Sequence, residues 1–201
     1  MEPQQKPTLN IYIDSNNFYK NAVQLLGVSK AKFNWGALIL GIRDVIQKEY
    51  ECSFSKAIYY SALSAKEDNE QKYNAQKRFL DAINRIPYVD THIGRLAKVP
   101  KTSGISVNPK DPSTYKHVEK NTDINISNDM LQHMYTNSTD IFVLCSADGD
   151  FEDTIKKIKD SGKTVLAVTP VGSKSIAIRN AIGDENIFYL DEAFLRHYIN
   201  S

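Results

Sequence analysis

The sequence predicts an α/β domain with a central, mainly parallel β-sheet and helices on both faces. Two observations predict it. Short apolar runs alternate along the chain with segments of helical periodicity, which is the order expected of a parallel sheet. The run at 140–147, "DIFVLCSA", is almost continuously apolar, as in strands buried on both faces. With 201 residues, the chain is long enough for one domain with a sizeable core.

The first half of the chain supplies three predicted strands and three predicted helices. We expect strands at 9–14, 56–63 and 88–96, and helices at 18–27, 34–50 and 69–86. Gly27 is expected to stop the first helix. The stretch 97–119 is rich in proline, glycine and serine, a composition typical of a loop or of a short hairpin.

The second half repeats the alternation. We expect a helix at 123–135, a strand at 140–147, a helix at 150–162 that stops at Gly162, and a strand at 164–169. A helix, a strand and a helix then close the chain. In the helix 123–135, one face is expected to carry Ile124, Ser127, Leu131 and Met134. The last segment, "LRHYI", fits either a homodimer contact or the last layer of the fold, and we favour the latter.

The composition excludes several classes of protein. The net charge of +1 indicates no strong global attraction to nucleic acid or membranes. No apolar run reaches membrane-spanning length, and the polar start does not resemble a signal peptide. Two cysteines make neither a disulfide framework nor a zinc cluster. We therefore expect a cytoplasmic protein without membrane contact.

Carboxylates follow two predicted strands directly. Asp14 ends the strand 9–14, and Asp148 and Asp150 follow the strand 140–147. Asp123 and Asp129 lie in the helix just before the second of these strands. Ligands of such sheets bind beyond the carboxyl ends of the strands, so these side chains converge if the two strands are neighbours. Converging carboxylates repel each other unless a cation lies between them, and hard oxygen ligands favour Mg²⁺ or Mn²⁺.

Each of these residues also has a purely structural interpretation. Asp123, Asp148 and Asp150 could each cap or stabilise a helix N-terminus. A cap needs one carboxylate, whereas "SADGD" supplies two. Asn16 would serve as the cap of the first helix, which would leave Asp14 unexplained. Asp129 lies about 120° around the helix from Asp123, so it either reaches the site or faces solvent.

Three motifs together resemble the NYN domain family, the LabA-like branch of the PIN-domain nuclease superfamily. They are "IDSNN", "KNTDINISNDML" and "SADGDFED". In the first motif, the matching residues are Asp14 and Asn17. In the second they are Lys120, Asp123 and Asp129, and in the third Ser146, Asp148, Gly149, Asp150 and Phe151. The family has glycine at positions 15 and 147, where this chain has Ser15 and Ala147, which is tolerable if both backbones have negative φ.

The resemblance implies a single PIN-like domain over 9–201, after a disordered tail at 1–8. It implies a Mg²⁺ or Mn²⁺ site and single-stranded RNA as the substrate. The catalytic and metal-binding set would be Asp14, Asp123, Asp148 and Asp150. Substrate-binding or supporting roles would fall to Asn17, Ser146, Lys120 and Asp129.

The stretch 97–119 and its margins form the most basic part of the chain. They carry Arg95, Lys98, Lys101, Lys110, Lys116 and Lys120. This variable basic loop could grip a phosphate backbone, with Tyr115 and His117 stacking on unpaired bases. The alternative is an ordinary solvated loop.

The leading hypothesis is a metal-dependent endoribonuclease that hydrolyses phosphodiester bonds with a metal-activated water. A second hypothesis keeps the fold as a non-catalytic module that binds RNA or a partner. A haloacid dehalogenase-like phosphatase is the third, but it needs a second Asp at position 16, where this chain has Asn16. Nucleotide-dependent enzymes are disfavoured because no Gly-rich phosphate loop follows any predicted strand.

Overall fold

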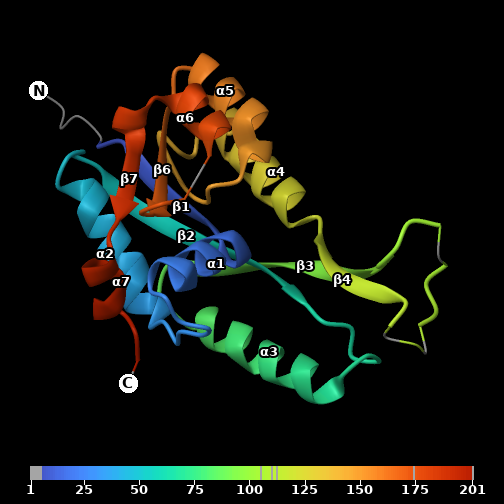
Figure 1. Ribbon diagram of the computed structural model, residues 1–201. Coiled ribbons are helices and arrows are strands. Elements are labelled where there is room, and N and C mark those ends of the chain that lie inside the picture. Colours follow the sequence, from blue (N-terminus) through green and yellow to red (C-terminus); the bar gives the residue numbers. More distant parts are fainter. Residues whose placement is uncertain (1–5, 105, 110, 112, 174, 201) are drawn as a thin grey trace, which may run out of the picture.

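A computed structural model describes residues 6–104, 106–109, 111, 113–173 and 175–200. Seven strands form one sheet in the order β4-β3-β2-β1-β5-β6-β7 (Figure 1). The strands are Thr8–Asp14 (β1), Ser53–Leu63 (β2), Val89–Pro100 (β3), Tyr115–Lys120 (β4), Ile141–Cys145 (β5), Thr164–Pro170 (β6) and Ile187–Leu190 (β7). Only the β3–β4 pair of this sheet is antiparallel. The predicted mainly parallel sheet is confirmed.

Helices cover both faces of the sheet. They are Ser15–Leu25 (α1), Trp35–Gln47 (α2), Glu70–Ile83 (α3), Thr122–Tyr135 (α4), Glu152–Asp160 (α5), Ile176–Ile182 (α6) and Glu192–His197 (α7), with short 3₁₀ turns at Gly149–Phe151 (η1) and Asp184–Asn186 (η2). Residues of α1, α2, α3 and α7 join one apolar core, and residues of α4, α5 and α6 join another. The helices of the two groups lie on opposite sides of the sheet (Figure 1). None of the helices in the described ranges is long and apolar enough to cross a membrane.

The buried face of α4 differs from the expected one. Ile124 is 60% exposed, whereas Thr122, Ile126 and Met130 are buried. Met134 belongs to both stripes and is buried as well. The sequence offers two overlapping apolar stripes on this helix, and the one that begins at Thr122 faces the sheet.

The stretch predicted as a loop at 97–119 is partly a hairpin. β3 continues to Pro100, and β4 pairs with it from Arg95↔Lys120 to Pro100↔Tyr115. The hairpin was one of the two alternatives for this stretch. Lys110 and Pro112 lie outside the described residues. At the N-terminus, β1 already begins at Thr8, one residue inside the expected tail, of which residues 1–5 are also outside the described part.

The C-terminal segment packs on the rest of the domain. Leu195 of α7 is fully buried, and the backbone N–H of Asn34 donates to the carbonyl of Tyr198 at 2.7 Å. Phe33 and Ile199 form an antiparallel bridge. These contacts support the last-layer interpretation of this segment.

Candidate active site

Three of the predicted carboxylates line one cavity at the carboxyl edge of the sheet. Asp14, Asp123 and Asp148 line a space of about 230 Å³, together with Asn16, Asn17 and Lys20. We call it the carboxylate cavity. β1 and β5 are parallel neighbours, which is the arrangement on which the predicted convergence depended. The cavity therefore gathers side chains from segments that are far apart in the sequence.

Asp14 both caps a helix and lines the cavity. It is the last residue of β1 and only 4% exposed. Its Oδ1 accepts a hydrogen bond from the backbone N–H of Asn17 at 3.1 Å, which makes Asp14 the N-cap of α1. The expectation that Asn16 is the cap was wrong. The helix begins at Ser15, directly after the strand, so the capping position falls on Asp14 itself.

Ser146 and Asn17 tie the two sides of the cavity together. The hydroxyl of Ser146 donates to Oδ2 of Asp14 at 2.9 Å and accepts from the backbone N–H of Asp148 at 3.1 Å. Oδ1 of Asn17 accepts from the backbone N–H of Ala147 at 3.0 Å. These bonds join the start of α1 to the turn after β5, and they fix the orientation of the Asp14 carboxylate.

Cys145 is a core residue beside this carboxylate. Burial, and secondly the negative charge of Asp14, raise the pKa of the Cys145 thiol above its ordinary value. A thiol with a raised pKa is a poor nucleophile at neutral pH. The chemistry of the cavity therefore rests on its oxygen groups.

Asp150 lies outside the cavity lining. Asp148 is the N-cap of η1, and its Oδ1 accepts from the backbone N–H of Asp150 at 3.1 Å. The Asp150 residue is exposed. Of the two carboxylates in the turn after β5, Asp148 thus lines the carboxylate cavity, while Asp150 is in the first turn of the 3₁₀ helix.

The start of α4 brings Asp123 to the cavity. Asn121 adopts a left-handed conformation with φ of 71°, and α4 begins at the next residue. A Cβ at Gly94 of β3 would lie 2.8 Å from Oγ1 of Thr122 and 3.0 Å from the carbonyl oxygen of Lys120. The absence of a side chain at Gly94 therefore lets the helix start lie close against β3.

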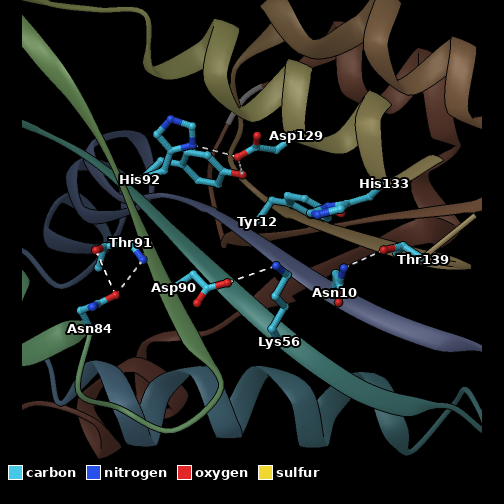
Figure 2. A network of polar contacts seen from close by, with 11 residues as sticks. Asn10, Tyr12, Lys56, Asn84, Asp90, Thr91, His92, Asp129, His133 and Thr139 are labelled. Atoms are coloured by element: carbon cyan, nitrogen blue, oxygen red, sulfur yellow. Dashed lines mark hydrogen bonds and ion pairs between the residues drawn. The ribbon is translucent and has the colours of Figure 1, made fainter. Parts of the chain in front are cut away.

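Asp129 does not line the cavity, and its carboxylate contacts two side chains of the sheet. Its Oδ2 accepts from the hydroxyl of Tyr60 at 2.8 Å. The same oxygen lies 2.9 Å from Nδ1 of His92 (Figure 2). One turn further along α4, Nδ1 of His133 lies 2.8 Å from the hydroxyl of Tyr12. In this structure the Asp129 carboxylate joins α4 to β2 and β3 through Tyr60 and His92.

Lys120 is likewise outside the cavity lining. It is the last residue of β4, is exposed, and pairs in register with Arg95. Its backbone carbonyl lies at the close approach to Gly94 described above. In this structure it contributes through the backbone at the start of α4.

The aromatic side chains of the hairpin are engaged within the protein. Tyr115 is 7% exposed, and Nζ of Lys98 lies 4.8 Å from the centre of its ring. Lys98 also pairs with Asp68, and Nε2 of His117 lies 2.9 Å from Oδ2 of Asp68. Hydrogen bonds from Lys98 and then His117 hold the pKa of Asp68 below its ordinary value. Base stacking by Tyr115 is therefore excluded in this arrangement, because its ring is buried.

Ser15 and Ala147, at the two positions where the family has glycine, do not have a positive φ. Among described residues other than glycine, positive φ occurs only at Tyr88, Asn121 and Asn137. Ser15 and Ala147 therefore meet the condition of a negative φ under which the loss of glycine is tolerable.

The donor set of the carboxylate cavity suits a hard divalent cation. The lining offers carboxylate and amide oxygens, which are ligands that Mg²⁺ and Mn²⁺ prefer. Within the described residues, no three Asp, Glu, His or Cys side chains already lie close enough together to hold a metal ion. The residue types fit such an ion, and the carboxylates would have to draw closer around it.

Sequence reasoning missed Asn16 and Lys20 as residues of this cavity. Both are exposed residues of α1, and Lys20 follows Asn16 by four positions. Residues four apart share one face of a helix. The shared helix face of Asn16 and Lys20 was not recognised because the first helix was expected to begin at Phe18.

Comparisons with known proteins give a family and a fold. The family model of the NYN domain matches residues 8–188. A crystal structure of a protein of unknown function from Vibrio parahaemolyticus superposes with a TM-score of 0.60 at 18% sequence identity, over 97% of this chain and 99% of that chain. At this identity the likeness shows the fold alone. A search of the curated proteins found no match.

Proposed function

Because this chain belongs to the NYN domain family, within the PIN-like nuclease superfamily, we propose that it is a metal-dependent endoribonuclease acting on single-stranded RNA. One observation carries the proposal. Asp14, Asp123 and Asp148 come from three separate segments and line one cavity. Unneutralised carboxylates that converge in this way repel each other, and a bound cation removes that cost.

Mg²⁺ or Mn²⁺ would be held by Asp14, Asp123 and Asp148. When bound, the cation neutralises phosphate charge and lowers the pKa of the attacking water. Asp150 enters the proposal as a neighbouring negative charge, because it is exposed and outside the cavity lining.

The chain's own residues would orient this set. Ser146 and the backbone of Asn17 each donate to one oxygen of Asp14, so that carboxylate has little freedom to rotate. Ser146 also holds the backbone at Asp148. Lys20 brings a positive charge to the same cavity, where it can pair with a phosphate of the substrate.

A non-catalytic RNA-binding or partner-binding module is the competing function. It would leave the carboxylates without a role that offsets their repulsion. The two functions differ in one measurable respect, which is turnover in the presence of a divalent ion.

The test is cleavage of end-labelled single-stranded RNA with Mg²⁺ or Mn²⁺, against the same reaction in excess chelator. We expect cleavage by the wild type with metal and none in chelator. Asp148→Asn should abolish cleavage, because it removes the charge yet keeps an acceptor for the backbone N–H of Asp150. Asp191→Asn is the matched control, since Asp191 caps α7 through the N–H of Phe194 and does not line the cavity. Full activity in Asp148→Asn, or cleavage that survives chelation, would refute the proposal.

A further inference from the structure

A larger cavity adjoins the carboxylate cavity. It has a volume of about 620 Å³ and is lined by residues of α1, α3, the segment 31–35 and strands β2, β3 and β4. Figure 1 shows α3 on the same side of the sheet as α1. Asn16, in the first turn of α1, lines both cavities. A ligand that spans this turn would therefore reach both.

Five Phe, Tyr and Trp rings line this space, which we call the aromatic cavity, and His117 lines it as well. The five rings are Tyr19, Phe33, Trp35, Tyr59 and Phe79. Consecutive rings in this order lie 6.2, 5.8, 4.9 and 6.2 Å apart between their centres. Trp35 and Tyr59 are almost fully buried, whereas Phe79 on α3 is 42% exposed. The row thus ends in a ring with an accessible surface.

Polar groups are interspersed among the rings. Asn16, Ser61, Gln76 and Asn200 line the same cavity, and Lys32 adds a positive charge. Oε1 of Gln76 accepts from the backbone N–H of Ser64 at 3.0 Å, which holds the orientation of the amide and lets its NH₂ group donate to a ligand. A cavity of this size with apolar walls and a few polar groups is typical of a small-molecule site.

We propose that the aromatic cavity binds a nucleobase of the RNA strand whose phosphodiester lies in the carboxylate cavity. This inference rests on the proposed function. Unpaired bases stack on accessible aromatic side chains, and in this row Phe79 is 42% exposed. Amide and hydroxyl groups can bond the edges of the base. A strand that passes Asn16 would carry phosphates past Lys20 and Lys32, one lysine in each cavity. Binding of the base would set the orientation of the RNA strand. The adjacent phosphodiester of that strand would then lie at the carboxylates.

The chain contains a built-in probe for this site. Trp35 is its single tryptophan and lines the aromatic cavity. We expect adenosine, guanosine, cytidine and uridine 5′-monophosphates to quench Trp35 fluorescence saturably in chelator. Ribose 5-phosphate, which has the sugar and phosphate but no base, should not quench it. Quenching by ribose 5-phosphate equal to that by the nucleotides, or none by any nucleotide at millimolar concentration, would overturn the proposal.

Two variants test which groups hold the base. Phe79→Ala should weaken nucleotide binding about tenfold, which corresponds to loss of one stacking contact, and Phe79→Tyr should restore it. Gln76→Glu keeps the acceptor for Ser64 but loses the donor, so it should also weaken binding. Tyr135→Ala is the matched control, because Tyr135 is 78% exposed and does not line the cavity. Wild-type affinity in both Phe79→Ala and Gln76→Glu would contradict the assignment.

Cleavage assays separate this inference from the proposed function. A Phe79→Ala enzyme with raised KM and unchanged kcat supports the base site. Metal-dependent cleavage with an unchanged KM in that variant overturns the base site alone. If the protein shows base-dependent quenching but never cleaves RNA, the proposed ribonuclease function is refuted and the proposed nucleotide-binding site is still supported.

Discussion

The hydroxyl of Ser146 donates a 2.9 Å hydrogen bond to Asp14 across 132 positions of the chain. Ser146 is 1% exposed and Asp14 is 4% exposed, so water does not readily compete with this bond. The same hydroxyl accepts from the backbone of Asp148. One small side chain therefore sets the relation between two of the cavity's carboxylates.

Ser146→Ala should impair cleavage more than folding. It removes the donor to Asp14 and the acceptor for Asp148, so we expect activity to fall about 10- to 100-fold, as for residues that orient metal ligands. The free energy of unfolding should fall by about 1–3 kcal/mol, the cost of leaving a buried polar group unpaired. Thr139→Val is the control. Thr139 is fully buried and accepts from Asn10 at 2.6 Å, but it lies before β5, at the other end of the strand. Equal activity losses in the two variants, measured with urea unfolding alongside, would contradict the role of Ser146.

Asp123→Asn and Asp150→Asn should differ. Asp123 lines the carboxylate cavity and Asp150 does not. We expect a loss of more than about 100-fold for Asp123→Asn, beyond the range of orienting residues, and less than about tenfold for Asp150→Asn. Initial cleavage rates at saturating Mn²⁺ decide this. Equal losses would mean that Asp150 is a ligand and that η1 shifts when the ion binds.

Gly94→Ala should displace the start of α4. The added methyl group would approach Thr122 and the Lys120 carbonyl at 3.0 Å or less, and such overpacking costs about 1–3 kcal/mol. Because Asp123 lies next to Thr122, we expect cleavage to fall about 100-fold, as for a displacement of about 1 Å in a catalytic group. Gly36→Ala is the matched control, since its nearest contact is 3.4 Å from Ile86. It should keep activity and stability, and similar activity losses in both variants would contradict the close-approach argument.

Lys20→Ala should weaken RNA binding in a salt-dependent way. Lys20 lines the carboxylate cavity, and loss of one phosphate contact lowers the slope of log K against log salt by about 1. Fluorescence anisotropy with labelled single-stranded RNA in chelator measures this slope. Lys157→Ala serves as the control, because Lys157 is an exposed residue of α5 outside both cavities. If the slope changes equally in both variants, the prediction that Lys20 contacts a phosphate of the RNA is wrong.

His133 should make the fold sensitive to mild acid. Burial, and secondly the charge of Lys56, lower the pKa of His133 below its ordinary value of 6.5. The unfolded chain then binds a proton that the folded chain excludes, so the contribution of this ring is complete above pH 6.5 and declines as the pH falls below it. We expect His133→Gln to remove this decline between neutral pH and about 5, measured by urea unfolding. The same substitution at the exposed His197 controls for loss of a histidine, and parallel profiles of His133→Gln and the wild type would refute the prediction.

The central strands β1, β5 and β6 were predictable because they are short apolar runs with clear ends. The alternation predicted β1, β5 and β6 within one or two residues, and the carboxylates that follow β1 and β5 share a cavity, as the topology implies. Which strands are neighbours depends on how they pair in three dimensions. The convergence of Asp14 and Asp148 therefore depends on the parallel pairing of β1 and β5, which only the structure shows.

The exposed face of α4 was not predictable from its apolar residues. Ile124 and Leu131 form a stripe about as well as Ile126 and Met130 do. The choice is made by buried hydroxyl groups on the sheet. Tyr60 and Tyr12 each need a hydrogen-bond partner, and Asp129 and His133 supply them from α4.

The position of β1 in the middle of the sheet has a consequence for biosynthesis. Its partner β5 begins only at Ile141, so Asp14, Asn16, Asn17 and Lys20 of the carboxylate cavity are synthesised well before Asp148. At cellular elongation rates of about 5–20 residues per second, the delay is on the order of ten seconds. During that interval Asp14 has no Ser146 to orient it. The arrangement of the carboxylate cavity can therefore be completed only after Ser146 and Asp148 have been synthesised.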